Sequence, residues 1–138
     1  MRAELVDFPT LLRESDFLSI HVPSTPATRR SIGANELAQM KQSAFLINTG
    51  RGNLVDEAAL VNALQSGQVR GAGLDVFENE PVVHPQLLEM NNVVLLPHIG
   101  SATEETRLNM ALLAATNLIQ ALEGKRPQNL VNAEVWKP

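Results

Sequence analysis

The chain has 138 residues, enough for one domain with a substantial hydrophobic core. Hydrophobic residues make up 44% and charged residues 19%, which excludes a disordered or fibrous protein. Eleven basic and fifteen acidic residues give a net charge of -4 without a basic stripe, so nucleic acid is not expected as a partner.

The sequence carries few signals of location. It contains no cysteine, which fits a reducing cytosol and leaves no thiolate for a metal site. No secretory leader opens the chain, and its apolar runs fall short of the roughly 18 residues that a membrane span needs. We therefore expect a soluble, cytoplasmic protein with no membrane association and no metal.

Four short apolar runs bounded by polar or turn residues predict β-strands. They are Phe17 to Val22, Ala44 to Ile47, Ala72 to Phe77 and Val93 to Leu96. The last three runs are almost continuously apolar, which is typical of strands covered on both faces in a parallel sheet.

Helical patterns lie between the predicted strands. Short helices are expected near Pro9 to Glu14 and Asn35 to Lys41, while His84 to Met90 is expected to form a turn or a brief helix. A longer helix is expected to begin at Asp56 as its N-cap and to stop at Gly67. This alternation of strands and helices predicts an α/β fold, whose ligands bind beyond the carboxyl ends of the strands.

The last helix has the clearest pattern. Ser101 and Glu104 have capping-box spacing, and Gly124 and Pro127 mark the end. Apolar residues recur every three or four positions at Leu108, Leu112, Ala115, Ile119 and Leu122, and Met110 and Leu113 widen this face. The helix is therefore expected either to pack against a second element besides its own sheet or to be wholly buried.

Polar residues follow each predicted strand. The four strand ends read His21-Val22-Pro23, Asn48-Thr49-Gly50-Arg51-Gly52, Glu78-Asn79-Glu80-Pro81 and Pro97-His98-Ile99-Gly100-Ser101. One crevice lined by these segments would hold a guanidinium, carboxylates and an imidazole, which together can bind an anion and move a proton.

The segments around Arg51, from Gly73 to Pro81, and around His98 resemble, in order and spacing, the signatures of the D-specific 2-hydroxyacid dehydrogenases. The resemblance runs from about Ser15 to about Asn132, and within the family it looks closest to glyoxylate and hydroxypyruvate reductases. It implies part of a Rossmann-type doubly wound parallel sheet flanked by helices. It also implies hydride transfer between NAD or NADP and a small 2-keto or D-2-hydroxy acid.

The resemblance implies three catalytic residues. Arg51 would hold the substrate carboxylate and carbonyl oxygen, His98 would be the acid/base, and Glu80 would fix the imidazole tautomer and favour its charged form. Without the motif, a surface ion pair of Arg51, a satisfied polar His98 and a solvent-facing Glu80 would be the ordinary readings.

The same resemblance implies cofactor contacts. They would come from Val22, Pro23, Thr49, Gly50, Arg51, Asp75, His98, Gly100 and Ser101. Asp75 lies in an apolar run and needs a partner, which is either the nicotinamide carboxamide or nearby backbone amides. For the glycines the alternative is ordinary turn chemistry, and for Ser101 it is the helix cap.

The chain lacks parts of the family pattern. It has no G-x-G-x-x-G loop, because Gly71-Ala72-Gly73 opens a strand run, and it lacks the region that selects NAD or NADP. Residues 1–125 are therefore expected to be the later half of an NAD(P)-binding domain, and residues 126–138 a tail that packs on a missing substrate domain. The fragment alone is expected to be inactive, and the parent is expected to be a homodimer.

Two other functions fit part of the sequence pattern. One is a dehydrogenase-like scaffold of the corepressor type, which senses NAD(P) and binds protein partners, and which the three polar residues do not exclude. The other is a hydrolase using His98 and Glu80, which is disfavoured because the chain has no G-x-S-x-G elbow and no cysteine.

Overall fold

The computed structural model describes residues 3–136. They divide into two compact units, one up to Gly100 and one from Ser101 onward. The first unit contains all the strands, and the second contains the long helix.

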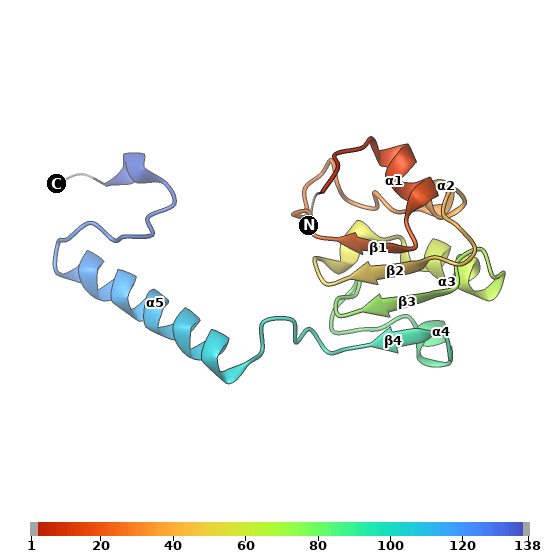
Figure 1. The fold of residues 1–138 in the computed structure, drawn as a ribbon. Helices are drawn as coiled ribbons and strands as arrows, with labels where there is room; N and C mark the ends of the chain where they lie inside the picture. Colours follow the sequence, from red (N-terminus) through yellow and green to blue (C-terminus); the bar gives the residue numbers. More distant parts are fainter. Residues whose placement is uncertain (1–2, 137–138) are drawn as a thin grey trace. The chain divides into compact units, whose positions relative to one another are not determined.

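The first unit is built on a four-stranded parallel sheet in the order β1-β2-β3-β4 (Figure 1). The strands are β1 (Phe17–Ile20), β2 (Phe45–Asn48), β3 (Gly71–Leu74) and β4 (Val93–Leu95). All four fall within or next to the predicted apolar runs. Because every pairing is parallel, the four carboxyl ends lie along the same edge of the sheet.

The third strand is shorter than predicted. The run was expected to continue to Phe77, but the strand ends at Leu74, and Asp75 begins the following loop. The residues from Asp75 to Phe77 are nevertheless buried. Burial in a loop, rather than in a strand, therefore explains why this part of the sequence is apolar.

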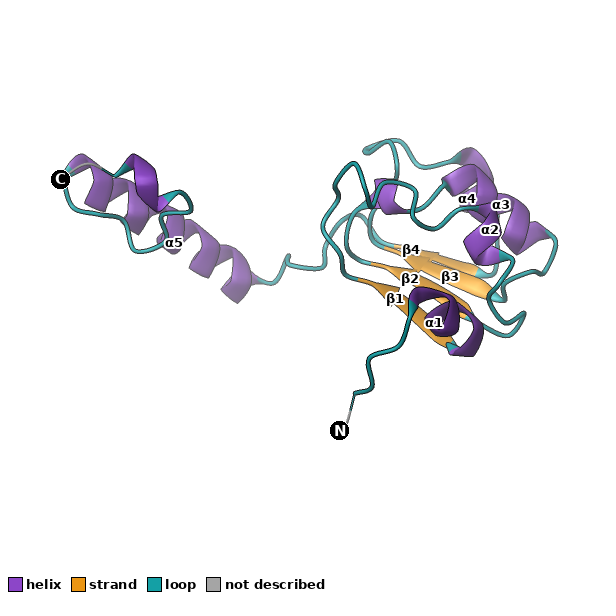
Figure 2. Cartoon of the chain, turned by 90° about the horizontal axis from the view of Figure 1, so that it is seen from above, coloured by secondary structure: helices purple, strands orange, loops and turns teal. Residues whose placement is uncertain are grey.

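Helices α2 (Ala34–Leu37), α3 (Glu57–Gln65) and α4 (Pro85–Leu88) connect successive strands and lie on one side of the sheet (Figure 2). The core lies between them and the sheet, and its fully buried side chains include Leu37, Leu46, Leu60, Val61 and Leu87. Burying one such side chain stabilises the fold by roughly 1.5–3 kcal/mol.

The opposite face of the sheet differs from the prediction. Strands β2 to β4 were expected to be covered on both faces, but in residues 3–100 the connecting helices lie on one face only. Phe17 and Val94 are exposed, and Phe45 stacks on Phe17 with ring centroids 5.4 Å apart. The second face of the sheet therefore carries apolar strand residues although no connecting helix of this unit covers it.

Helix α3 begins and ends where the sequence predicts. The Asp56 side chain accepts a hydrogen bond from the Ala59 backbone N–H at 3.0 Å, which caps the helix. Gly67 follows the helix with a φ of 71°, the left-handed conformation that favours glycine. This helix starts five residues after Gly52, close to the arginine-bearing turn.

The other helices of this unit are short. Helix α1 (Phe8–Glu14) is capped by Asp7 and contacts α2. Helix α2 covers only the first part of the predicted Asn35 to Lys41, and α4 confirms the brief helix predicted within His84 to Met90.

The second unit consists mainly of α5 (Glu104–Leu122), followed by a short 3-10 helix, η2 (Ala133–Val135). The predicted cap of α5 was wrong. Thr103, not Ser101, is the N-cap, and its hydroxyl accepts the Thr106 backbone N–H at 3.1 Å. Threonine provides a hydroxyl acceptor as serine does, so Thr103 was an equally suitable N-cap two residues after Ser101.

The α/β fold predicted from the sequence is confirmed: a parallel sheet flanked by helices. Among the helices of residues 3–136, none combines the length and hydropathy that crossing a bilayer requires.

Candidate functional site

The four carboxyl strand ends form two neighbouring clefts. The first has a volume of about 550 Å³ and is lined by segments that follow β1 and β2. Its lining residues are His21, Val22, Pro23, Ser24, Thr49, Gly50 and Arg51. Five residues predicted to contact the cofactor are thus brought together in a single cleft.

The second cleft has a volume of about 480 Å³ and brings together Arg51, Glu80 and His98. These side chains come from the loops after β2, β3 and β4. Arg51 and Ser24 line both clefts. The guanidinium, carboxylate and imidazole predicted to act together therefore share one cavity, which adjoins the first cleft.

Asn48 shapes the turn that presents Arg51. This last residue of β2 is 1% exposed, and its side-chain amide donates to the Arg51 carbonyl at 3.0 Å. Its side-chain oxygen accepts the Gly50 backbone N–H at 3.1 Å. Both polar groups of a buried amide are satisfied in this way, so the turn is tied to the sheet. The Arg51 guanidinium itself is exposed and donates to the Gly50 carbonyl at 2.7 Å.

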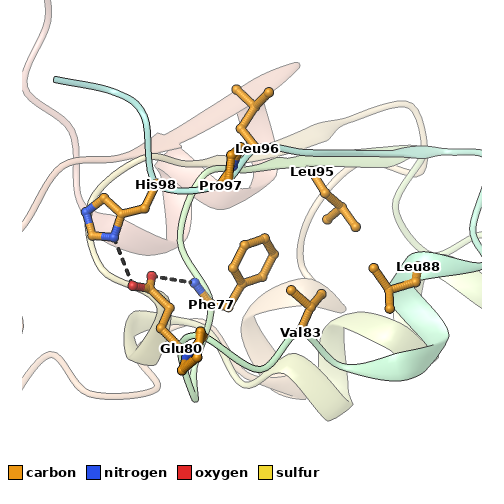
Figure 3. Close-up of a pocket in the computed structure, with 9 residues that line it drawn as sticks. Phe77, Glu80, Val83, Leu88, Leu95, Leu96, Pro97 and His98 are labelled. Carbon is orange, nitrogen blue, oxygen red and sulfur yellow. Dashed lines mark hydrogen bonds and ion pairs between the residues drawn. The ribbon is translucent and has the colours of Figure 1, made fainter. Parts of the chain in front are cut away.

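Glu80 and His98 form the central polar contact of the second cleft. Glu80 Oε2 lies 2.9 Å from His98 Nδ1, and Glu80 Oε1 accepts the Phe77 backbone N–H at 3.0 Å (Figure 3). The carboxylate accepts hydrogen bonds only, so Nδ1 carries the proton and donates. The other ring nitrogen, Nε2, is then the one left to exchange a proton with a ligand.

The electrostatic surroundings keep Glu80 ionised. Its hydrogen bond to His98 is the main cause that lowers the pKa of the carboxyl below its ordinary value, and the Phe77 N–H and the charges of His98 and Arg51 act in the same direction. Partial burial opposes this effect. The result is a carboxylate that accepts the hydrogen bond of His98 Nδ1.

Asp75 fixes the loop that carries His98. It is 3% exposed, its Oδ1 accepts the Ile99 N–H at 2.8 Å, and its Oδ2 accepts the Gly100 N–H at 2.7 Å. His98 itself has a φ of 54°, a left-handed conformation that is costly for a residue with a Cβ. Two charge-assisted hydrogen bonds from the next two residues help to hold it there.

An apolar pocket of about 320 Å³ lies on the other side of the Glu80–His98 pair. Phe77, Val83, Leu88 and Leu95 point into it, and Figure 3 shows the pair at its margin. The pair therefore has an apolar environment on one side and the polar second cleft on the other.

The remaining predicted site residues are placed as follows. Gly100 lies against Asp75, where an added Cβ would be 3.0 Å from the carboxylate. Ser101 belongs to the second compact unit. No cluster of three or more histidine and acidic side chains suited to a metal occurs among residues 3–136.

Sequence reasoning gave no individual role to three residues that shape this region. Asn48 organises the arginine turn, Ser24 lines both clefts, and Glu78 joins neighbouring loops. Only Asn48 left a signal in the sequence, as a polar residue at the end of an apolar strand that must find partners. The other two depend on contacts between distant segments.

The first cleft has features that suit part of a dinucleotide. It lies beyond the carboxyl ends of parallel strands, where open α/β sheets bind such ligands. At Gly50 an added Cβ would be 3.2 Å from the Ile20 carbonyl, so glycine permits the backbone to pass close to β1. The chain provides no glycine-rich loop for the pyrophosphate, so the residues present fit the two ends of a dinucleotide but not its pyrophosphate.

Comparison with known proteins gives a consistent result. Residues 1–100 match the family described as D-isomer specific 2-hydroxyacid dehydrogenase, NAD binding domain. A glyoxylate reductase from Thermococcus litoralis is 57% identical over 133 residues, which is 96% of this chain and 40% of that protein.

Solved structures show the same similarity. A glyoxylate reductase from Paecilomyes thermophila superposes with a TM-score of 0.87 at 46% identity, covering 94% of this chain and 39% of that one. An NADPH-dependent glyoxylate/hydroxypyruvate reductase from Sinorhizobium meliloti, in complex with NADP and malonate, gives a TM-score of 0.80 at 46% identity, with coverage of 83% and 36%. The chain thus spans about two fifths of the length of the curated relatives it matches.

Proposed function

Because this chain belongs to the D-isomer specific 2-hydroxyacid dehydrogenase family, we propose that its parent protein transfers a hydride between NAD(P) and carbon 2 of a small 2-keto or D-2-hydroxy acid. Glyoxylate and hydroxypyruvate are the proposed substrates, because the relatives are named for them. The observation that carries the proposal is the hydrogen-bonded Glu80–His98 pair, which shares a cleft with Arg51.

Arg51 is proposed to bind the substrate. Its planar guanidinium matches a carboxylate bidentately and can also reach a carbonyl oxygen next to it. The side chain is exposed at the border of both clefts, which allows it to orient a keto acid beside the cofactor. A positive charge there also stabilises the negative charge that develops on the carbonyl oxygen during reduction.

His98 is proposed to be the acid/base. When bound, the reduced nicotinamide supplies the hydride that is added to carbon 2. His98 gives its Nε2 proton to the carbonyl oxygen, so the product is the hydroxy acid and the imidazole is left neutral. In the oxidative direction neutral His98 accepts the hydroxyl proton. Glu80 holds Nδ1 and stabilises the charged ring in both directions.

The cofactor is proposed to lie along the first cleft. Val22 and Pro23 would contact the adenosine side, and Thr49 and Gly50 the nicotinamide side. Asp75, Gly100 and Ser101 are proposed to contribute near the ring. The backbone hydrogen bonds of Asp75 leave further lone pairs on its carboxylate oxygens for such a contact.

In the parent, residues 1–125 would form the later half of the cofactor domain, and residues 126–138 would pack on the substrate domain. Residues 1–2 and 137–138 of these ranges lie outside the residues that the structure describes. We further propose a cytoplasmic homodimer. The 138-residue chain alone is expected to turn over little, since it lacks the pyrophosphate loop and most of the substrate pocket.

The proposal is tested by a reductase assay on the full-length parent. Oxidation of NADH and of NADPH is followed with glyoxylate, hydroxypyruvate and pyruvate. Turnover of glyoxylate or hydroxypyruvate is expected, and the comparison of the two nucleotides identifies the preferred cofactor. Cofactor binding without turnover of any combination of nucleotide and keto acid would contradict the proposed enzymatic function and favour the scaffold function.

A further inference from the structure

The segment that carries Arg51 and the segment that carries Glu80 touch directly at Gly52. This glycine is buried, and a Cβ added to it would lie 1.9 Å from the carbonyl carbon and oxygen of Phe77. No side chain fits there without moving one of the two backbones. The residue after the arginine is therefore packed on the backbone that leads to the glutamate.

A second contact joins the same two segments. Glu57 is the first residue of α3 and is 6% exposed, and its Oε1 accepts the Glu78 backbone N–H at 2.6 Å. In return, Glu78 Oε2 lies 3.5 Å from the Glu57 backbone N, at the outer limit for a hydrogen bond. Each glutamate side chain thus approaches the backbone N–H of the other. The shorter of the two contacts is the one that the Glu57 carboxylate accepts.

Arg30 offsets the charge of this pair. Its Nε and Nη2 both lie 2.7 Å from Glu78 Oε1, and the hydrogen bond to Glu78 raises the pKa of Arg30. Arg30 also donates its backbone N–H to the Asn53 carbonyl at 2.8 Å. A cation from the loop after β1 therefore makes it possible to keep Glu78 nearly buried beside a second carboxylate.

These contacts flank the atoms that orient the catalytic pair. Glu80 lies two residues after Glu78, and its Oε1 is held by the N–H of Phe77, the residue that packs on Gly52. Movement of Phe77 or Glu78 would therefore displace Glu80 from His98 Nδ1. It would also change the position of Glu80 relative to Arg51, which is on the opposing segment.

We propose that Glu57 is a positioning residue of the active site, acting through Glu78 and the Gly52–Phe77 contact to fix the Arg51 segment against the Glu80 segment. This inference rests on the proposed function for its consequence in catalysis. Gly52 and Glu78 line the cleft of Arg51 and His98, whereas the lining residues do not include Glu57. A change of Glu57 therefore acts without removing a contact to the substrate.

The test uses two variants of the full-length parent. Glu57→Met has a similar length but no acceptor for the Glu78 N–H, whereas Glu57→Gln keeps an acceptor oxygen. We expect Glu57→Met to lower kcat/KM about tenfold, because small misplacements of catalytic groups are costly. We also expect the loss to fall on kcat rather than on the KM for the cofactor, because the first cleft is not lined by the Glu80 segment. Glu57→Gln should keep both properties close to those of the wild type.

Matched measurements separate positioning from loss of fold. Rates are divided by the concentration of folded sites, measured by cofactor binding, and Asp16→Asn is the control. Like Glu57→Met, Asp16→Asn removes one carboxylate charge. Asp16 pairs with Lys41 in an exposed ion pair, and it lies just before β1, at the amino end of that strand. A kcat and kcat/KM of Glu57→Met equal to those of the wild type would overturn the proposal.

Two further measurements keep the test decisive. If Glu57→Met does not fold, Arg30→Met is used, because the Arg30 side chain is half exposed. A smaller fall in kcat/KM than for Glu57→Met is then expected. If the wild-type parent turns over no substrate, the proposed function fails. The positioning role is then judged from the NMR signal of the His98 Nδ1–H that donates to Glu80, which should weaken or move in Glu57→Met and whose constancy would refute the role.

Discussion

Glu80 and His98 meet at 2.9 Å between Oε2 and Nδ1, although 18 positions separate them in the sequence and they follow different strands. Both side chains are partly exposed, at 37% and 51% respectively. The contact therefore owes its geometry less to burial than to the loops on either side. The Phe77 N–H holds the glutamate, and the Asp75 carboxylate holds the loop of the histidine.

The ionised state of Glu80 predicts a pH-dependent contribution to stability. Its pKa in the folded protein is depressed below the ordinary value of about 4.5, chiefly by His98. The contribution is therefore fully present above that ordinary value and is lost as the pH falls through the lower folded value. Urea unfolding of the wild type and of Glu80→Gln should differ at neutral pH and converge in strong acid. A difference that persists unchanged into acid would contradict this account.

The same substitution should change the kinetics of the parent. Reduction requires protonated His98, and Glu80→Gln removes the charge that stabilises it while retaining the shape of the side chain. We expect kcat/KM at neutral pH to fall by about tenfold to a hundredfold. An unchanged kcat/KM would show that the carboxylate does not act on the imidazole.

Arg51→Lys should weaken use of the keto acid. Lysine keeps the charge but cannot make two parallel hydrogen bonds to a carboxylate. A fall in kcat/KM for the keto acid of about tenfold or more is expected at saturating cofactor. Arg29→Lys, at an exposed position in the loop after β1, is the matched control. Equal effects of the two changes would exclude substrate binding by Arg51.

Asp75→Asn should loosen the loop of His98. Asparagine offers one acceptor oxygen instead of two, so its amide group would face either the Ile99 or the Gly100 N–H, both of which are donors. The variant of the parent is expected to lose about 1–3 kcal/mol of stability and part of its kcat. Thermal unfolding and steady-state kinetics measure the two effects. A variant as stable as the wild type would mean that the two backbone hydrogen bonds of Asp75 contribute little to stability.

The sequence predicts the strand positions, the start and stop of α3, and three of the polar side chains of the second cleft, Arg51, Glu80 and His98. These features depend on local signals, such as the apolar runs, the Asp56 cap and Gly67. The end of β3 at Leu74 is different, because Asp75 leaves the strand to bind amides 24 and 25 residues further along. The Glu57–Glu78 contact is equally non-local, so no pattern in either segment indicates it.

The central claim is that His98 exchanges the proton during reduction of a keto acid by the parent protein. The most direct measurement is kcat of the full-length wild type and of His98→Ala, with the cofactor and substrate that the wild type prefers. We predict a fall in kcat of about a hundredfold to ten-thousandfold, measured at saturating cofactor. A variant that retains wild-type kcat would contradict the account.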